Sequence, residues 1–304
     1  MRVMVTGGNG FLGRYVVREL EANGHDVFAP SSKEYDLTTD DGLAQVFREP
    51  VDGLIHLAAV VGGIGANGDH PGRFFYENAL MGIRLIDTAT AHSIKKVLTV
   101  GTACSYPAFG PIPQMEEDFW HGYPARATAP YAMAKKMLLV QQQAYRKEYG
   151  LHAAYVILAN LYGPGDNFDL ATGHVVPSVI RKVQLARDEK RYEAIMWGTG
   201  MATRDFLYVE DAARGIRLAF ENYDEPDPLN LGSGVEVPVY GLVDTVTMLM
   251  GYSGVITWDH SRPDGQLRRC LDITKAKDRL DWEPLVDLEE GLSRTIEWWK
   301  LQPK

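Results

Sequence analysis

The chain has 304 residues, 45% hydrophobic and 23% charged, which is the balance of a soluble globular protein with one large domain or two smaller ones. Its formal net charge of −9 and pI near 5.4 argue against a nucleic-acid partner, which would select clustered Lys and Arg. The sequence holds no signal peptide, no apolar run of about 20 residues that would span a membrane and no CxxC or clustered-histidine metal motif; we therefore expect a cytoplasmic protein without a metal or membrane partner.

Apolar, β-branched runs alternate with segments of helical period along the first half of the chain. We expect strands at 2–7, 25–30, 53–59, 95–102 and 153–163, and helices at 13–23, 40–48, 76–92 and 131–149. Strands that are apolar on both faces and separated by helices predict a parallel sheet covered on both sides, so the fold class is α/β with a doubly wound sheet.

The rhythm changes near Pro164 to Gly, Asp and Pro with short apolar pieces. A strand and capped helix at 204–220 and a strand within 228–234 then predict a return to the first domain. We therefore expect a dinucleotide-binding domain of residues 1–163 with 204–232, and a smaller α/β substrate-binding lobe of residues 164–203 and 233–304.

A glycine loop follows the first expected strand and opens the first expected helix. Its GxxGxxG spacing places Gly7 in a tight turn, Gly10 where the backbone approaches a pyrophosphate, and Gly13 where helix and strand pack closely. Strand-to-helix turns use glycine anyway, but this βαβ context favours a dinucleotide site. The residues expected to bind the cofactor here are Gly7, Asn9, Gly10, Phe11 and Leu12.

The end of the second expected strand indicates which dinucleotide is bound. Enzymes that prefer NAD usually carry Asp or Glu there to bind the ribose 2′-hydroxyl. This chain has Ser31, Ser32 and Lys33, two hydroxyls and an ammonium that suit a 2′-phosphate, so NADP(H) is favoured. NAD(H) stays possible if the serines only form a turn and Glu34 or Asp36 binds the ribose.

Tyr131 and Lys135 lie four residues apart, on one face of an expected helix. A nearby ammonium would lower the tyrosine pKa from about 10 toward neutrality, as acid–base catalysis needs. With the glycine loop and Thr102 at the end of a strand, this pair resembles the catalytic triad of the extended short-chain dehydrogenase/reductase family, which has a Rossmann fold.

That resemblance extends over essentially the whole chain. It implies that Tyr131 and Lys135 also contact the cofactor, with Asp36 and Leu37 near the adenine. Further cofactor contacts implied by the family are Leu57, Ala58, Ala59 and Asn78.

The stretch GTACSYP, residues 101–107, distinguishes reactions within the family. Dehydratases of the family carry an Asp-Glu pair after the Ser/Thr, where this chain has Ala103 and Cys104. A cysteine here resembles the GDP-fucose synthase branch, which catalyses 3,5-epimerisation and 4-reduction of a GDP-4-keto-6-deoxy-sugar, and also the GDP-mannose 3,5-epimerases. Five further stretches favour the first branch: 60–67, 160–168, 173–182, 197–211 and the RPDG motif at 262–265.

The chemistry of that branch gives the candidate residues their roles. A C4 ketone acidifies the protons at C3 and C5, and inversion needs groups on both faces, which the resemblance assigns to Cys104 as base and His174 as acid. Tyr131 would protonate the reduced oxygen and Thr102 would hold it. The resemblance implies substrate contacts from Asn160, Val175, Lys182, Trp197, Arg204 and Arg262.

Simpler interpretations stay open for several of these residues. Cys104 can be a small buried hydrophobe, His174 structural, and Arg204 an ion-pair partner of Asp205. The chain also departs from the family in having Thr102 for serine, Thr128-Ala129-Pro130 for Asn-Glu, and Lys182 for arginine.

Three functions follow in order of preference. The first is the NADPH-dependent epimerase/reductase. The second is an enzyme with only one of these activities, such as an NAD-dependent GDP-mannose 3,5-epimerase. The third is a non-catalytic cofactor-binding regulatory protein. The family resemblance also implies a homodimer that pairs through two helices of each chain.

Overall fold

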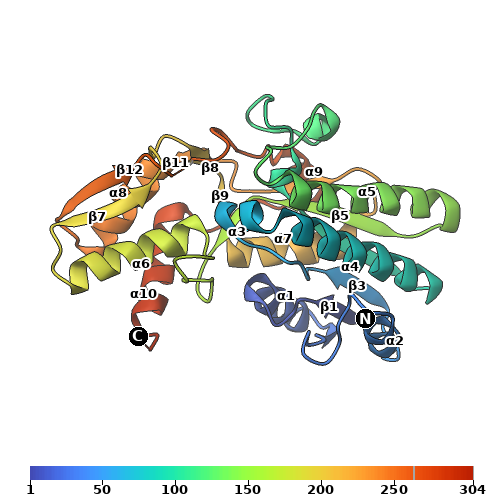
Figure 1. Cartoon of the computed structure of the whole chain (residues 1–304). Helices are drawn as coiled ribbons and strands as arrows, with labels where there is room; N and C mark the ends of the chain where they lie inside the picture. Colours follow the sequence, from blue (N-terminus) through green and yellow to red (C-terminus); the bar gives the residue numbers. More distant parts are fainter. Residues whose placement is uncertain (263, 304) are drawn as a thin grey trace.

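The computed structural model describes residues 1–262 and 264–303 and contains one large parallel sheet (Figure 1). Its strands are β1 (Arg2–Thr6), β2 (Asp26–Phe28), β3 (Gly53–His56), β4 (Lys96–Thr102), β5 (Ala153–Leu158) and β10 (Leu229–Leu231). They lie in the order β10-β5-β4-β3-β1-β2, and every neighbouring pair is parallel. The α/β Rossmann fold expected from the sequence is therefore confirmed.

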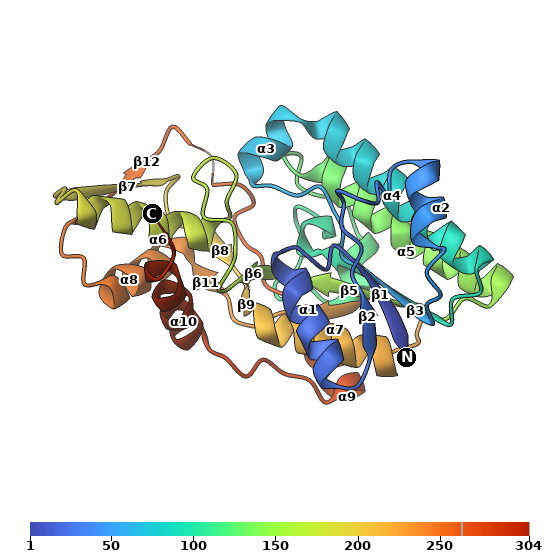
Figure 2. The same ribbon diagram turned by 90° about the horizontal axis from the view of Figure 1, so that it is seen from below.

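Helices cover both faces of this sheet (Figures 1 and 2). The pair α1 (Phe11–Ala22) and α7 (Val209–Asn222) packs on one face, and the pair α4 (Pro71–Ala91) and α5 (Ala129–Tyr149) on the other. Shorter helices, α2 (Asp40–Val46) and α3 (Ile64–Asp69), lie in the connections, and α9 (Thr274–Leu280) packs against β10 and α7. Full coverage explains why all six residues of β5 are buried.

Three elements differ from the sequence expectations. Helix α4 begins at Pro71, five residues early, because proline suits the first turn of a helix. Helix α3 was not expected, since its sequence IGANGD contains two glycines. The strand expected at 153–163 is two strands, β5 and β6 (Asn160–Tyr162), because β6 leaves the large sheet and pairs with β9 (Phe206–Tyr208).

A second hydrophobic core lies beside the first, at the left of Figure 1. Its helices are α6 (Val175–Asp188), α8 (Val239–Met250) and α10 (Leu288–Lys300). Two small sheets complete it: β7 (Glu193–Trp197) with β12 (Val255–Asp259), and β8 (Thr203–Arg204) with β11 (Val237–Pro238). These elements fall within the expected second lobe, 164–203 with 233–304, except for Arg204 of β8, which was expected in the first domain. Lys304 lies outside the described residues.

One segment of that expected lobe belongs to the other core. Leu271, Ala276, Leu280 and Trp282 are buried in the core of the large sheet, and the Trp282 indole donates to the Asp211 carbonyl of α7 at 3.1 Å. The chain thus returns to the large sheet after β12, where α9 packs against β10.

The two cores meet at Asp205, which is fully buried. Its carboxylate accepts hydrogen bonds from the Ser233 amide at 2.7 Å, the Ser233 hydroxyl at 2.6 Å and the Leu271 amide at 3.2 Å. Its carbonyl accepts from the amide of Asn160 at 3.1 Å. Four segments that pass between the cores are therefore fixed to one another at a single residue.

The contact between α1 and the glycine loop leaves no room for a side chain at Gly13. A Cβ there would lie 2.0 Å from the Gly7 carbonyl oxygen and 2.6 Å from the Gly8 Cα, and both are backbone atoms that cannot move aside. We expect Gly13→Ala to lower the free energy of unfolding by about 2–3 kcal/mol, as overpacking does, and to lower the melting temperature. Gly241→Ala in α8 is the matched control, since its nearest atom would lie 3.5 Å away. Equal melting temperatures for the two variants would contradict this packing argument.

Candidate active site

The carboxyl ends of β1 and β3 meet where the strand order reverses, since β2 and β3 flank β1 on opposite sides. Ligands of doubly wound sheets bind at such a point. Gly7 follows β1 with φ of +74°, and a Cβ on it would lie 2.7 Å from the Ala58 amide nitrogen. Glycine is therefore required at position 7 by both the backbone angle and the close approach of the segment after β3.

The N-terminus of α1 is free to bind an anion. Gly10 is its N-cap, no side chain caps the helix, and its first turn contains no acidic residue. A Cβ on Gly10 would meet only the Gly7 carbonyl oxygen, at 3.1 Å, so the outer side of the loop is open. Unbonded amides and a helix dipole suit a pyrophosphate, and these residues fit the dinucleotide expected from the sequence. The side-chain Nδ2 of Asn9, in contrast, donates to the Ala29 carbonyl at 3.4 Å.

The expected 2′-phosphate residues follow β2 at the same edge. Ser32 and Lys33 are exposed, Ser31 is partly buried, and the Ser31 hydroxyl accepts from the Lys33 amide at 3.3 Å. The Asp36 carboxylate instead accepts from the Thr38 hydroxyl and amide, and these bonds lower the pKa of Asp36. The Lys33 ammonium is thus available to an anion.

Asn78 supports the cofactor segment from behind. It is buried in α4, its Oδ1 accepts from the Val60 amide at 3.0 Å, and its Nδ2 donates to the carbonyls of Val60 at 3.0 Å and Phe74 at 2.7 Å. These bonds fix the chain that follows Leu57, Ala58 and Ala59, which are partly buried at the site edge.

The GTACSYP stretch forms the end of β4 and a short 3-10 turn, Ala103–Ser105. The Thr102 hydroxyl accepts from the Cys104 amide at 3.2 Å, and the Ser105 hydroxyl donates to the Ala132 carbonyl of α5 at 2.9 Å. Cys104 lies in this turn, and as a residue it is partly exposed. Cys104 is therefore not a fully buried hydrophobe.

Arg269 is the neighbour of Cys104 that sequence reasoning missed. Its Nη1 lies 3.2 Å from the Cys104 sulfur. Burial acts to raise the pKa of Cys104, but Arg269, the Thr102 hydroxyl and Arg204 outweigh it, so the pKa is lowered. No motif could have indicated Arg269, because it is 165 positions away in sequence.

Tyr131 and Lys135 lie in the first turns of α5, as expected, but their electrostatics differ from expectation. Burial, and secondarily the charge of Cys104, raise the pKa of Tyr131 well above its ordinary value. Burial also lowers the pKa of Lys135 to about 8. This direction is opposite to the lowering expected from Lys135, because the loss of hydration disfavours the charged phenolate.

A second buried lysine, Lys136, fastens the segment after Cys104 to α5. Its ammonium donates to the carbonyls of Ser105, at 3.3 Å, and of Phe119, and lies 4.5 Å from the ring centroids of Phe119 and Trp120. Its position beside Lys135 in the sequence gave no signal of this role.

His174 is the N-cap of α6 and is exposed. Its Nδ1 lies 3.6 Å from Oδ1 of the buried Asp166, which raises the pKa of His174. Asp166 was not singled out in the sequence. The loop that precedes His174 contacts the large lobe, where the Tyr15 hydroxyl donates to the Pro164 carbonyl at 2.8 Å.

Three of the expected substrate residues lie together, and the others lie apart from them. Trp197, half exposed at the end of β7, has the Lys182 ammonium 4.8 Å and the Arg262 guanidinium 4.9 Å from its ring centroid. The remaining residues lie elsewhere: Val175 packs on the second core, and Asn160 donates to the Asp205 carbonyl at 3.2 Å. Pro263, within the RPDG stretch, lies outside the described residues.

Arg204 does not pair with Asp205, and it acts on Cys104 only through its charge. Its guanidinium donates to the carbonyls of Thr203 at 2.7 Å, Gln266 at 2.7 Å and Asp264 at 3.1 Å. Burial and the charge of Arg269 lower the pKa of Arg204 to about 10. The surface ion-pair interpretation of Arg204 is therefore wrong.

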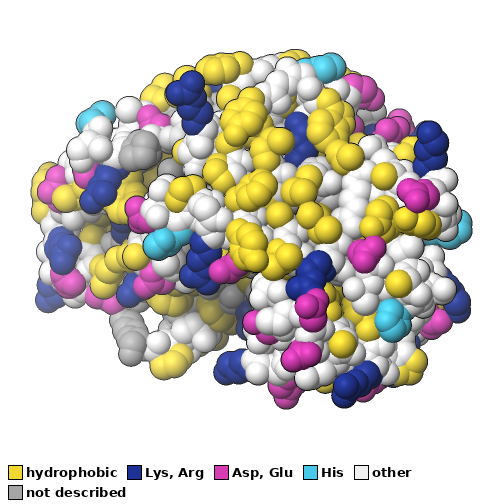
Figure 3. Space-filling view, turned by 45° about the vertical axis from the view of Figure 1, so that its right-hand side comes forward, with side chains coloured by type: hydrophobic (Ala, Val, Ile, Leu, Met, Phe, Trp, Pro, Cys, Tyr) yellow, Lys and Arg dark blue, Asp and Glu magenta, His cyan; other side chains and the backbone are white. Residues whose placement is uncertain are grey.

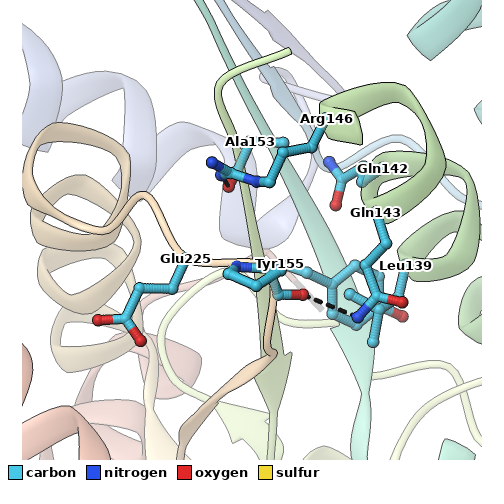
Figure 4. A pocket seen from close by; sticks show the side chains of 8 residues that line it. Leu139, Gln142, Gln143, Arg146, Ala153, Tyr155 and Glu225 are labelled. Carbon is cyan, nitrogen blue, oxygen red and sulfur yellow. Dashed lines mark hydrogen bonds between the residues drawn. The ribbon is translucent and has the colours of Figure 1, made fainter. Parts of the chain in front are cut away.

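A crevice at the opposite edge of the sheet is not a second site. It lies where β5 begins, and it is lined by Leu139, Gln142, Gln143, Arg146, Ala153, Tyr155, Glu225 and Pro226 (Figure 4). These side chains fill it and leave no room for a ligand. Within the described residues, no helix is long and apolar enough to cross a membrane, and no group of three or more His, Cys, Asp or Glu could hold a metal ion.

A family model described as the NAD dependent epimerase/dehydratase family matches residues 3–232. The chain belongs to this family. It is 35% identical over 301 residues to probable GDP-L-fucose synthase 1 of Oryza sativa subsp. japonica, covering 98% of this chain and 92% of that protein. It is 32% identical over 308 residues to GDP-L-fucose synthase of Escherichia coli (strain K12), covering 98% of this chain and 96% of that protein.

A solved structure agrees with these family members. A GDP-L-fucose synthetase from Naegleria fowleri bound to NADP has a TM-score of 0.89 and 26% identity, and the match covers 98% of this chain and 94% of that one. The resemblance to the GDP-fucose synthase branch is confirmed.

His56 gives the glycine loop a pH-dependent support. The buried imidazole Nδ1 hydrogen-bonds the Thr6 hydroxyl at 2.8 Å, directly below Gly7. Burial, and secondarily the charge of Lys135, lower the pKa of His56 well below 6.5. The unfolded chain binds a proton near pH 6.5 that the folded chain excludes, so stability is full above that pH and falls below it, by at most about 1.4 kcal/mol per pH unit.

We expect His56→Gln to reduce this acid sensitivity. Between pH 7.5 and 5.0, the free energy of unfolding, measured by urea titration, should fall by about 1–2 kcal/mol less in His56→Gln than in the parent. His260→Gln, at an exposed position, is the control and should follow the parent. An unchanged pH slope in His56→Gln would show that His56 titrates as it does in the unfolded chain.

Proposed function

We propose that this protein catalyses the 3,5-epimerisation and NADPH-dependent 4-reduction of a GDP-4-keto-6-deoxy-sugar, with GDP-4-keto-6-deoxymannose as the substrate to test. The observation that carries the proposal is the pairing of Cys104 with Arg269 one turn beyond Thr102. A reductase alone needs no thiolate at this place. The full-length similarity to GDP-L-fucose synthases supports the substrate class.

The cofactor in this proposal is NADP(H), and bound NADPH supplies the hydride for C4 of the sugar. The N-terminus of α1 would hold its pyrophosphate, and Ser31, Ser32 and Lys33 its 2′-phosphate. The NADP-bound relative supports this choice. The division into a cofactor-binding domain and a substrate-binding lobe is part of the proposal.

Epimerisation begins with proton removal beside the C4 ketone. The Cys104 thiolate takes the proton from C3 or C5; the C–H bond breaks, an S–H bond forms, and the electron pair moves toward the C4 oxygen. His174, whose pKa Asp166 raises, returns a proton to the same carbon from the other face. Transfer of the gained proton from the Cys104 thiol to the neutral imidazole restores both groups.

Reduction then needs a proton at the C4 oxygen. Tyr131 donates it from the phenol, and the raised tyrosine pKa keeps that proton in place until the alkoxide forms. The Thr102 hydroxyl orients the oxygen, and Lys135 would bind the nicotinamide ribose and return a proton to Tyr131. The lowered lysine pKa, about 8, suits such proton return.

The substrate nucleotide would lie on the smaller lobe. Trp197 offers a half-exposed ring between Lys182 and Arg262, which suits an aromatic base beside a diphosphate. Arg204, whose charge acts on Cys104, would contact a phosphate or sugar oxygen of the substrate.

The test separates the two half-reactions with two variants. The protein is mixed with NADPH and GDP-4-keto-6-deoxymannose in D2O; NADPH absorbance reports reduction, and mass spectrometry of the nucleotide sugar reports deuterium at C3 and C5. Cys104→Ser should slow deuterium entry by about 100-fold or more, and Tyr131→Phe should slow NADPH oxidation similarly while exchange continues. Cys270→Ser is the control for the cysteine change and should match the parent.

Other outcomes identify the alternative functions. NADPH oxidation without exchange would leave a reductase, exchange without oxidation an epimerase, and neither signal a cofactor-binding protein without turnover. Replacing NADPH by NADH in the same assay tests the cofactor preference, and faster oxidation of NADH would overturn it.

We also propose that the protein is a homodimer that pairs through α4 and α5. Hydrophobic side chains gather on the face seen in Figure 3, and Phe75, Tyr76 and Val140 of these helices are 43%, 63% and 50% exposed. Adjacent helices with exposed apolar side chains suit a four-helix bundle between two copies. A cytoplasmic location agrees with the free thiol that Cys104 needs.

Light scattering after size-exclusion chromatography tests the dimer. The parent should have the mass of two chains, and Tyr76→Glu combined with Val140→Glu should have the mass of one, because two carboxylates would be buried in the interface. Met248→Glu, at a position 62% exposed on α8, is the control and should stay dimeric. A monomeric parent, or a double variant that stays dimeric, would rule out this interface.

A further inference from the structure

Arg269 is buried, with 6% of its surface exposed, and within residues 1–262 and 264–303 no carboxylate forms an ion pair with its guanidinium. Its Nη1 contacts the Cys104 sulfur at 3.2 Å, and its Nη2 donates to Oε1 of Gln266 at 2.8 Å. Its Nε is buried and has no hydrogen-bond partner in the described chain. A buried cation without a counter-ion is costly, so a negative charge on the sulfur would compensate it.

The neighbouring residue Arg268 shows the ordinary alternative. It is exposed and makes a two-point contact with Glu236, from Nε at 2.7 Å and from Nη2 at 2.5 Å. Two adjacent arginines therefore have different counter-ions, a carboxylate for one and the Cys104 sulfur for the other.

The position of Arg269 is fixed before any substrate binds. Gln266 donates from its Nε2 to the carbonyls of Pro107 at 3.4 Å and Ala108 at 3.3 Å, so it joins Arg269 to the chain just after Cys104. The Leu271 amide is fixed to Asp205 at 3.2 Å. Arg269 is thus held from both sides, at Gln266 and through Leu271.

The second cysteine, Cys270, shows how the pKa of a buried thiol shifts when no arginine among the described residues contacts the sulfur. Cys270 is 3% exposed, and its thiol donates to the Leu271 carbonyl at 3.8 Å. Burial, and secondarily the charges of Asp205 and Glu236, raise its pKa to about 12. Cys104 has the opposite shift, a lowered pKa, although burial also acts on it.

We propose that Arg269 is a positioning residue that keeps Cys104 in its thiolate form and aims the sulfur for proton abstraction, with Gln266 holding the guanidinium in place. The assignment of proton abstraction to Cys104 rests on the proposed function, whereas the stabilisation of the thiolate does not. Arg204, whose guanidinium is occupied by three carbonyl groups, adds positive charge from farther away.

The pH profile of thiol alkylation tests the thiolate directly. In a Cys270→Ser background, the rate of Cys104 alkylation by iodoacetamide is followed by mass spectrometry from pH 5 to 10. The midpoint should lie below the value of about 8.5 for a free cysteine, and Arg269→Gln should raise it by about one unit or more, since one unit corresponds to a tenfold change in thiolate equilibrium. Arg268→Gln removes the same charge one position away and should leave the midpoint unchanged.

Arg269→Lys keeps the positive charge but lacks the two guanidinium contacts, to Cys104 and to Gln266. Its alkylation midpoint should therefore lie between those of the parent and of Arg269→Gln. Equal midpoints for Arg269→Gln and Arg268→Gln would overturn the proposal. If Arg269→Gln does not fold, the parent profile still decides, because a parent midpoint at or above 8.5 would also overturn it.

Deuterium exchange separates this proposal from the proposed function. In Arg269→Gln, exchange at C3 and C5 should fall about tenfold at pH 7 and recover as the pH rises toward the new thiol midpoint. A parent that shows the low alkylation midpoint but no exchange would refute the epimerase function and leave the role of Arg269 intact. Exchange in Arg269→Gln that equals the parent at every pH would refute the role of Arg269 in proton abstraction.

Discussion

The geometry of the candidate site depends on one buried carboxylate, that of Asp205. Burial raises its pKa, yet hydrogen bonds from Ser233 and Leu271 act in the opposite direction and satisfy its oxygens. Because a buried carboxylate is tolerated only when its oxygens are bonded, these segments must meet at this point. Arg204 precedes Asp205 in the chain, and Arg269 lies two residues before Leu271, so the same junction brings both arginines to Cys104.

The pKa values of the candidate catalytic side chains depend on burial as much as on contacts with charged neighbours. Tyr131 and Lys135 are both shifted toward their neutral forms by loss of water, whereas Cys104 is shifted toward its charged form because two guanidiniums compensate it. One small region thus contains a phenol whose pKa is raised and a thiol whose pKa is lowered. This difference suits a sequence of proton abstraction followed by proton donation.

The fold, and the elements that carry the candidate site residues, could be predicted from the sequence because both depend on local patterns. Strand periodicity, the Gly7-Gly10-Gly13 spacing and the Tyr131-Lys135 pair are short-range signals, and the structure places each on the expected element. The family resemblance assigned Asn78 to the cofactor, whereas the polar side-chain atoms of Asn78 bond backbone groups of Val60 and Phe74. A motif identifies the residue type at a position, but not the partner that its side chain meets.

The sequence by itself determined the parallel sheet, the glycine loop and the presence of a thiol after Thr102. Only the tertiary structure decided that this thiol faces Arg269, that Asp166 accompanies His174, and that α9 returns to the first core. The physical reason is separation along the chain. Backbone conformation and amphipathic pattern are set by neighbours within a few residues, whereas the charge on the partly buried Cys104 thiol is set by groups that only folding brings within hydrogen-bonding distance.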